Sequence, residues 1–120
     1  MTRLSAAAAI CAALAVTAWA QAQPAKKAYM IVQADVSNPT QYGEYTKLSP
    51  GIIEKFGGRF VARGGRATTL EGPAGPSRVV IVEFPSFERA QQFYDSPEYT
   101  AARKVRAGAA TFHAVLVEGL

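Results

Sequence analysis

The spacing of apolar residues along the chain predicts four short β-strands. Each run has the length of a strand, and most are rich in β-branched or aromatic residues. The runs span residues 28–36, 59–63, 78–84 and 111–118. Gly64 and Gly65 predict a bulge or bend after the second run, beyond which residues 67–70 can continue the same strand. The glycines and prolines at 72–76 predict the turn of a hairpin that joins the second strand to the third.

Two segments between these runs repeat apolar residues at helical spacing. The first covers residues 38–56 and opens with an Asn-Pro capping signal. Pro50 lies inside this segment and predicts a kink or break near Ser49. The second segment covers residues 85–108, and a fresh start signal at Ser96 predicts that a new stretch of helix begins there.

The resulting order of elements, βαββαβ, predicts an α+β domain with the ferredoxin-like fold. Right-handed crossovers that each skip a strand give a four-stranded antiparallel sheet in the order 4-1-3-2, with both helices on one face. The first, third and fourth strands carry apolar residues on both sides, although only one side would meet the helices. A domain of about 100 residues has little apolar surface to leave uncovered. We therefore expect a homodimer in which a second subunit covers the open face.

The first twenty positions differ in composition from the rest of the chain. Sixteen of them are apolar, a basic residue stands near the start, and small residues follow at signal-peptidase spacing. This pattern predicts a signal peptide over residues 1–22, cleaved after Ala20 or Ala22, and an exported protein that is periplasmic or secreted. A membrane anchor is the alternative, but the apolar stretch is shorter than the roughly 20 residues that a spanning helix needs. Residues 23–27 are expected to form a disordered lead-in to a domain that covers residues 28–119.

Cleavage changes which kinds of chemistry are open to the protein. It would remove the single cysteine, Cys11, and one arginine, so that the formal net charge falls from +4 to +3. The mature domain would then have no disulfide, thiolate metal site or catalytic cysteine. Its basic residues are scattered, which together with export argues against nucleic acid as a partner. No cluster of His, Asp and Glu has metal-ligand spacing, so we expect neither a metal nor another cofactor, and no membrane partner after cleavage.

His113 and Glu83 are the candidate catalytic residues. His113 is the only histidine and stands in the middle of the last strand, where it is either an acid or base in a pocket or a packed core or interface residue. Glu83 interrupts the most apolar strand, so it is either paired, for example with an arginine, or held in a pocket as a base. Both interpretations stay open for each residue.

A second group of residues consists of candidates for ligand binding. The Arg-Gly-Gly-Arg segment that begins at Arg63 offers guanidinium groups beside a backbone that a carboxylate or phosphate can approach closely, or else it forms a bulge at a solvent-exposed edge. It lacks the lysine and following helix of a nucleotide-binding P-loop. The tyrosines at helical spacing either line a pocket or fill the core. The candidates are Tyr42, Tyr45, Arg63, Gly64, Gly65, Tyr99 and Arg103.

Two functional hypotheses follow from these residues. In the first, the exported dimer binds a small aromatic or acidic metabolite between sheet and helices, with or without cofactor-free chemistry, through Tyr45, Arg63, Glu83, Tyr99 and His113. In the second, it is a non-catalytic dimeric interaction or structural module in which the same residues serve packing and capping. The first hypothesis requires a pocket of roughly 300 Å³ or more in which several of these polar groups converge.

Several motifs, taken in order, resemble those of one protein family. They include Asn38-Pro39 with Tyr42 and Tyr45, residues 57–65 (GGRFVARGG), residues 78–86 (RVVIVEFPS), residues 93–99 (FYDSPEY) and the closing Val117-Glu118-Gly119. Over residues 28–119 the chain resembles the domain-of-unknown-function family numbered 1330. The resemblance implies a dimeric α+β barrel, two ferredoxin-like units packed sheet to sheet, and no established activity. Related barrel proteins include cofactor-independent monooxygenases, haem-dependent chlorite dismutases and stress-responsive proteins, so a monooxygenase-like or isomerase-like reaction is a third hypothesis.

Overall fold

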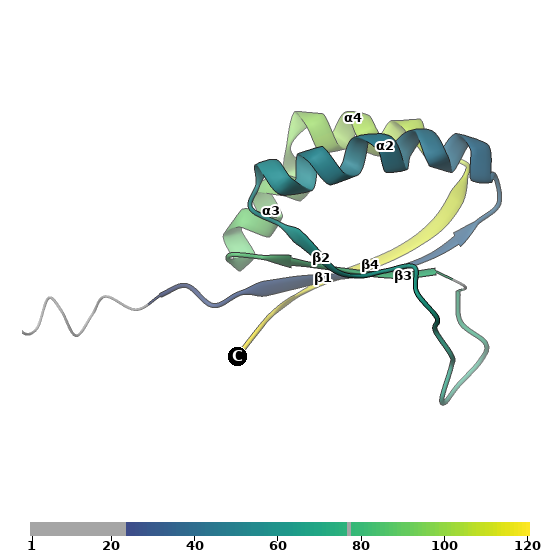
Figure 1. Cartoon of the computed structure of the whole chain (residues 1–120), viewed down its shortest axis with the longest axis horizontal. Helices are drawn as coiled ribbons and strands as arrows, with labels where there is room; N and C mark the ends of the chain where they lie inside the picture. The colour runs from purple at the N-terminus through teal and green to yellow at the C-terminus, as the bar shows by residue number, and fades with distance from the viewer. Residues whose placement is uncertain (1–23, 77) are drawn as a thin grey trace, which may run out of the picture.

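The computed structural model describes residues 24–76 and 78–120, so the predicted signal peptide lies outside the described residues. Figure 1 shows the three helices together on one side of a sheet. The elements, in chain order, are β1 (Ala28–Val36), α2 (Pro39–Lys55), β2 (Arg59–Arg63), β3 (Arg78–Phe84), α3 (Phe87–Asp95), α4 (Pro97–Val105) and β4 (Ala110–Glu118).

The strands form one antiparallel sheet in the order β2-β3-β1-β4. This order confirms the predicted ferredoxin-like topology. The central strands pair from Ala28 opposite Phe84 to Ala34 opposite Arg78, and β4 pairs with the other side of β1 along its whole length. Because successive residues of a strand point to opposite sides, the sheet has a helix face, which the helices cover, and an open face on the other side.

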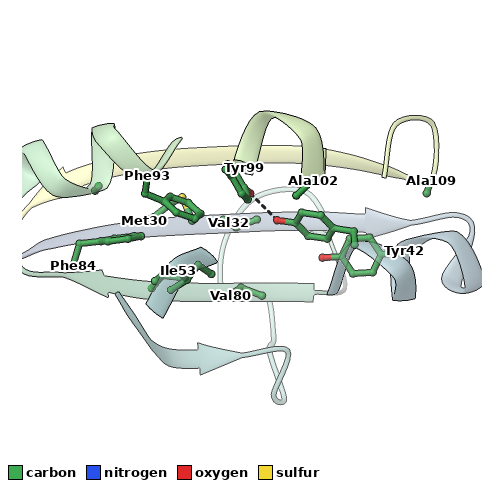
Figure 2. Close-up of a cluster of buried hydrophobic side chains, with 13 residues drawn as sticks. Met30, Val32, Tyr42, Ile53, Val80, Phe84, Phe93, Tyr99, Ala102 and Ala109 are labelled. Carbon is green, nitrogen blue, oxygen red and sulfur yellow. Dashed lines mark hydrogen bonds between the residues drawn. The ribbon is translucent and has the colours of Figure 1, made fainter. Parts of the chain in front are cut away.

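The core lies between the helices and the helix face of the sheet (Figure 2). Val82 and Phe84 of β3 and Phe93 of α3 are almost completely buried. The ring of Phe93 lies 5.1 Å from that of Phe84 and 4.2 Å from that of Tyr99 in α4. Contacts between aromatic rings at these distances add to the free energy of burying them, so this cluster anchors α3 and α4 to the sheet.

Helix α2 runs without interruption from Pro39 to Lys55, so of the kink or break predicted near Ser49 the break is wrong. Pro50 still removes one backbone hydrogen-bond donor from the helix. Both halves of α2 are nevertheless fixed by burial, through Tyr45 before the proline and Ile53 after it. Packing against the sheet therefore outweighs the local preference of proline for a helix end.

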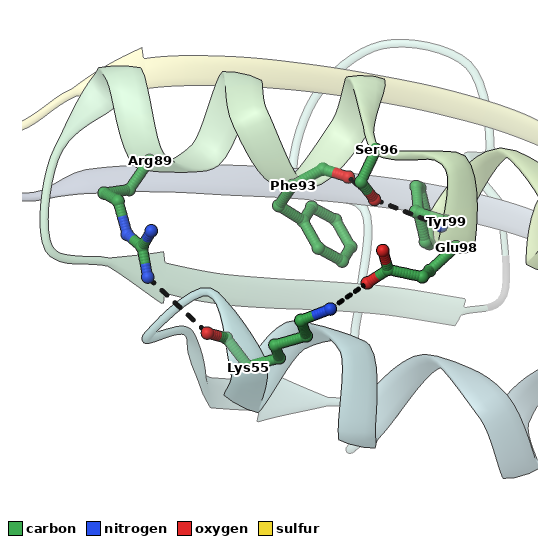
Figure 3. A network of polar contacts seen from close by, with 6 residues as sticks. All are labelled: Lys55, Arg89, Phe93, Ser96, Glu98 and Tyr99. Atoms are coloured by element: carbon green, nitrogen blue, oxygen red, sulfur yellow. Dashed lines mark hydrogen bonds and ion pairs between the residues drawn. The ribbon is translucent and has the colours of Figure 1, made fainter.

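Ser96 separates α3 from α4, which confirms the helix start predicted at this residue. Its hydroxyl donates to the Phe93 carbonyl at 2.7 Å and accepts from the Tyr99 N–H at 3.2 Å (Figure 3). Beside this junction, the Lys55 ammonium at the end of α2 pairs with the Glu98 carboxylate at 2.8 Å. The junction thus ties the ends of all three helices together.

Strand β2 ends at Arg63, and residues 67–70 do not continue it. Gly64 instead turns the chain with a φ of 67°, a conformation that favours glycine. The bulge predicted after β2 lies within it, between Phe60 and Ala62, where β2 has one residue more than β3. Figure 1 shows the loop that follows β2 hanging on the side of the sheet opposite the helices.

Candidate functional site

A small cavity, here called the tyrosine cavity, lies between α2 and the helix face of the sheet. Its volume is about 30 Å³, which is enough for one or two water molecules. It is therefore far smaller than the pocket of roughly 300 Å³ that the first hypothesis requires. Hydroxyl groups from α2 and α4 and apolar side chains from the sheet surround it, among them Tyr42, Tyr45, Ser49, Tyr99, Met30, Val32, Val80 and Phe112.

A surface cleft of about 400 Å³, here called the arginine cleft, adjoins this cavity between α2 and the start of β3. Cavity and cleft share Tyr42, Thr46, Arg63 and Arg78 in their walls. Within residues 24–76 and 78–120, no carboxylate forms an ion pair with either arginine. The cleft therefore gathers two positive charges for which the described part of the chain supplies no counter-charge.

The bulge in β2 places Arg63 in the cleft. Phe60 packs on the helix face, and in a regular strand Ala62 would be the next residue on that face. The extra residue shifts this alternation by one position. As a result Ala62 pairs with Ile81 on the open face, and Arg63 pairs with the buried Val80 on the helix face.

Arg78 reaches the same cleft from β3. It stands on the helix face opposite Ala34, and its guanidinium carbon lies 5.8 Å from the centre of the Tyr42 ring. Its Nε atom is buried and has no hydrogen-bond partner among the described residues. A Cβ atom at Gly64 would overlap this guanidinium. The group that comes close to the Gly64 backbone is therefore the Arg78 side chain, where the sequence predicted a ligand. Gly65 has open space around it.

Tyr45 of α2 and Tyr99 of α4 form a buried hydroxyl pair at the wall of the tyrosine cavity. Figure 2 marks the hydrogen bond at the Tyr99 hydroxyl with a dashed line. Their oxygens are 2.6 Å apart, and the residues are only 6% and 2% exposed. Burial, and next the neighbouring Tyr99 hydroxyl, raise the pKa of Tyr45 well above its usual value, although Arg106 opposes this shift. Tyr45 therefore keeps its proton at neutral pH, and either hydroxyl of the pair can be the donor.

Tyr42 and Ser49 are buried residues that add two more hydroxyls to the wall of the same cavity. Neither hydroxyl has a hydrogen-bond partner in the part of the chain that the structure describes. The fourth hydroxyl of α2 in this wall, that of Thr46, donates to the Gly43 carbonyl at 3.0 Å. The cavity is thus an apolar space with several hydrogen-bond donors on its surface.

Glu83 lies on the open face of the sheet, away from the cavity. Its Oε1 atom is 3.0 Å from the Nε of Arg59 and 3.3 Å from the Nζ of Lys27. The hydrogen bond from Arg59, and then that from Lys27, lower the pKa of Glu83 in spite of the desolvation that acts against them. Of the two interpretations of Glu83, the structure therefore supports the paired carboxylate. Lys27, the last residue of the expected lead-in, also accepts the Gly119 N–H at 2.7 Å through its carbonyl.

His113 and Arg103 also lie outside the cavity. His113 is exposed on the open face, opposite Gln33 of β1. Arg103 of α4 stacks 4.3 Å over the ring of Tyr94 in α3 and donates to the Tyr94 hydroxyl at 3.1 Å. The structure therefore brings Tyr42, Tyr45, Arg63 and Tyr99 together around the cavity. Arg103 lies outside the cavity, with its guanidinium 5.7 Å from the centre of the Tyr99 ring. Because Glu83 and His113 lie on the open face, the five-residue pocket of the first hypothesis does not form in one subunit.

Sequence reasoning missed Arg78 and Ser49 as site residues. For Arg78 a signal exists, because it shares the alternation of Val80, Val82 and Phe84 and is the one charged residue on that side of β3. An arginine at such a position is expected either to be paired or to face a site. Ser49 offers no comparable signal, since a small polar residue on a helix also suits solvent.

Two further properties of the described residues concern membranes and metal ions. No helix among them has the length and apolar character to span a membrane. Within the same residues, no group of three or more His, Cys, Asp and Glu side chains could hold a metal ion.

A family model described as Domain of unknown function (DUF1330) matches residues 27–120. No curated protein matches the chain. Among solved structures, a protein of unknown function from Rhodopseudomonas palustris is similar, with a TM-score of 0.64, 21% identity and coverage of 89% of this chain and 92% of that one.

Two more distant structures share the fold. SnoaB, a cofactor-independent oxygenase from Streptomyces nogalater, has a TM-score of 0.58 and 11% identity, with coverage of 80% of this chain and 95% of its own. A dimeric protein of unknown function and ferredoxin-like fold from Bacteroides fragilis has a TM-score of 0.53 and 14% identity, with coverage of 81% and 100%. At such identities the likeness concerns the fold alone.

Proposed function

Since this chain belongs to the family described as Domain of unknown function (DUF1330), we propose its function from the site alone. The protein binds a small organic acid in the arginine cleft. The observation that carries this proposal is the pair of guanidiniums, Arg63 and Arg78, in one cleft without a carboxylate partner among the described residues. A bound carboxylate would supply the missing counter-charge through charge-assisted hydrogen bonds.

The surroundings of the two arginines favour an acid with an aromatic or apolar body. Tyr42, Val36 and Pro39 line the same cleft, so a flat apolar group can rest beside the guanidiniums. The raised pKa of Tyr45 keeps its hydroxyl protonated at the inner wall. A tyrosine that abstracts a proton as a base would instead need a lowered pKa. These groups of the cleft and the cavity therefore support binding more directly than catalysis.

Binding of benzoate tests this proposal. We expect isothermal titration calorimetry to detect binding to the natural chain and a loss of roughly tenfold or more in affinity for Arg63→Gln and for Arg78→Gln, because each removes charge-assisted hydrogen bonds. Arg66→Gln is the matched control, since Arg66 ends the same Arg-Gly-Gly-Arg segment but lines neither the arginine cleft nor the tyrosine cavity. Benzyl alcohol, which has no charge, should bind weakly. Equal affinity for benzyl alcohol, or unchanged binding by both cleft variants, would refute the proposal.

We also propose that two copies pack through their open faces. Ile31, Ile81 and Val115 form an apolar row across β1, β3 and β4 on this face. Val79 and Val117 extend it to either side, and Val115 and Val117 are nearly half exposed in the single subunit. An apolar sheet surface of this kind marks a protein interface. The similar protein from Bacteroides fragilis, described as dimeric, offers a precedent on the same fold.

Export completes the proposal, with a mature chain that begins at Gln21 or Gln23. Native mass spectrometry of the protein from the exported fraction of its host checks three points together. The mass of the chain reports the mature N-terminus, the mass of the assembly reports the dimer, and any excess mass reports a retained acid. A chain of full length, found in the cell interior, would contradict export.

A further inference from the structure

The hydroxyl pair of Tyr45 and Tyr99 has more donors than it uses. Two hydroxyls carry two hydrogens, and the single bond between them at 2.6 Å occupies only one. The other hydrogen has no acceptor among the described residues. Tyr42 and Ser49 each add a hydroxyl in the same condition, so the wall of the tyrosine cavity presents up to three donors without an acceptor.

The size of the tyrosine cavity limits what can meet these donors. A volume of about 30 Å³ admits one or two water molecules, or a single oxygen-bearing substituent, but not an aromatic ring. The adjoining cleft of about 400 Å³ has room for the ring and the acid group. A ligand held by Arg63 and Arg78 in the cleft can therefore place only a small substituent inside.

We propose, as a step that rests on the proposed binding function, that the ligand is an aromatic acid with a hydroxyl or oxo group on the end that enters the tyrosine cavity. An apolar substituent would displace water from Tyr45, Ser49 and Tyr99 and leave their hydroxyls without partners. An oxygen atom replaces the lost hydrogen bonds. The cleft thus selects the charge of the ligand, and the cavity selects its second polar group.

Matched substituted benzoates test this inference. Hydroxybenzoate and methylbenzoate, each as the 3- and 4-isomer, carry substituents of nearly equal size that differ in hydrogen bonding. We expect the better hydroxybenzoate to bind roughly tenfold more tightly than the methylbenzoate with the same substitution pattern, as measured by calorimetry. The Tyr45→Phe/Tyr99→Phe double variant keeps both rings and removes both hydroxyls. In it, or in Ser49→Ala, the preference should fall at least threefold.

Tyr94→Phe is the matched control, because the Tyr94 hydroxyl accepts from Arg103 and does not line the cavity. It should leave the preference unchanged. If the natural chain binds both benzoates equally, or if neither cavity variant changes the preference, the inference is wrong while the arginine cleft stands. If no benzoate binds at all, the proposed function and this inference fail together. Circular dichroism of each variant confirms that a changed preference does not reflect a lost fold.

Discussion

Charged side chains on the two faces of the sheet differ in how they are neutralised. On the open face Glu83 is paired twice, with Arg59 and with Lys27. On the helix face Arg63 and Arg78 share a cleft and have no ion pair within the described residues. A paired charge stabilises the folded chain alone, whereas two like charges in one cleft repel each other until an anion binds. Glu83 is therefore expected to affect stability, and the two cleft arginines to affect binding.

Replacing Glu83 by Gln should lower the free energy of unfolding near pH 7, because both ion pairs are lost. The folded-state pKa of Glu83 lies below the usual glutamate value of 4.5, so this stabilisation is present above that value and disappears as the pH falls through the folded-state pKa. Urea unfolding of both chains between pH 3 and pH 7 measures the difference. Glu44→Gln, which removes the exposed pair with Lys47, should change little at any pH. A Glu83→Gln effect as large at pH 3 as at pH 7 would show that the lost stability has another cause.

Among the elements, α3 and α4 depend on one shared residue. The Ser96 hydroxyl closes the end of α3 through the Phe93 carbonyl and opens α4 through the Tyr99 N–H. The rings of Phe93 and Tyr99 meet 4.2 Å apart across the same junction. The Ser96 hydroxyl thus links α3 and α4 at the point where the two rings pack together.

Ser96→Ala should cost about 1–2 kcal/mol of unfolding free energy, because both helix ends lose a hydrogen bond. Ser86→Ala is the matched control, since Ser86 caps α3 alone, through the Arg89 N–H at 3.1 Å. It should cost about 1 kcal/mol. Urea unfolding at a fixed pH compares the two variants. A smaller loss for Ser96→Ala than for Ser86→Ala would contradict the shared role.

The elements themselves could be predicted from the sequence to a large extent. The apolar runs predicted all four strands, and the capping residues predicted the new helix start at Ser96. The handedness of the crossovers predicted the strand order. The break predicted at Pro50 does not occur, because burial of Tyr45 and Ile53 holds both halves of α2 on the sheet. This burial cannot be read from the local sequence.

The site could be predicted less well, and strand geometry explains why. The tyrosines and Arg63 were recognised, but a one-residue bulge decides which side of β2 Arg63 occupies. No glycine marks this bulge, so the pattern placed it at Gly64 and Gly65 instead. Glu83 and His113 were grouped with the tyrosines because the sequence alone did not show that they lie on the open face. The register of the strands places them there, on the side of the sheet opposite the cavity.

On the scale of the molecule, the open face of the sheet carries an apolar row that the helices do not cover. Ile31 lies in the middle of this face, between Ile81 and Val115. The loop after β2 extends on the same side (Figure 1). One subunit therefore presents a broad surface whose burial would favour association.

Sedimentation equilibrium should find the natural domain as a dimer at micromolar concentration. Ile31→Lys should sediment as a monomer, because it places a charge at the centre of the proposed interface. Leu48→Lys is the control, since Leu48 is exposed on α2, on the helix side of the sheet. It should leave the dimer intact. A natural chain that sediments as a monomer, or an Ile31→Lys variant that stays dimeric, would rule out the open face as the interface.

The bulge in β2 makes the charge of the cleft depend on the pairing register of one strand. A chain that kept Val61 but paired regularly with β3 would place Arg63 opposite Val79 and turn it toward the open face. Loss of the bulge in this way would remove half of the positive charge of the cleft although every lining residue is still present in the sequence. Among family members, the register of this strand therefore matters as much as the presence of the arginine when acid binding is compared.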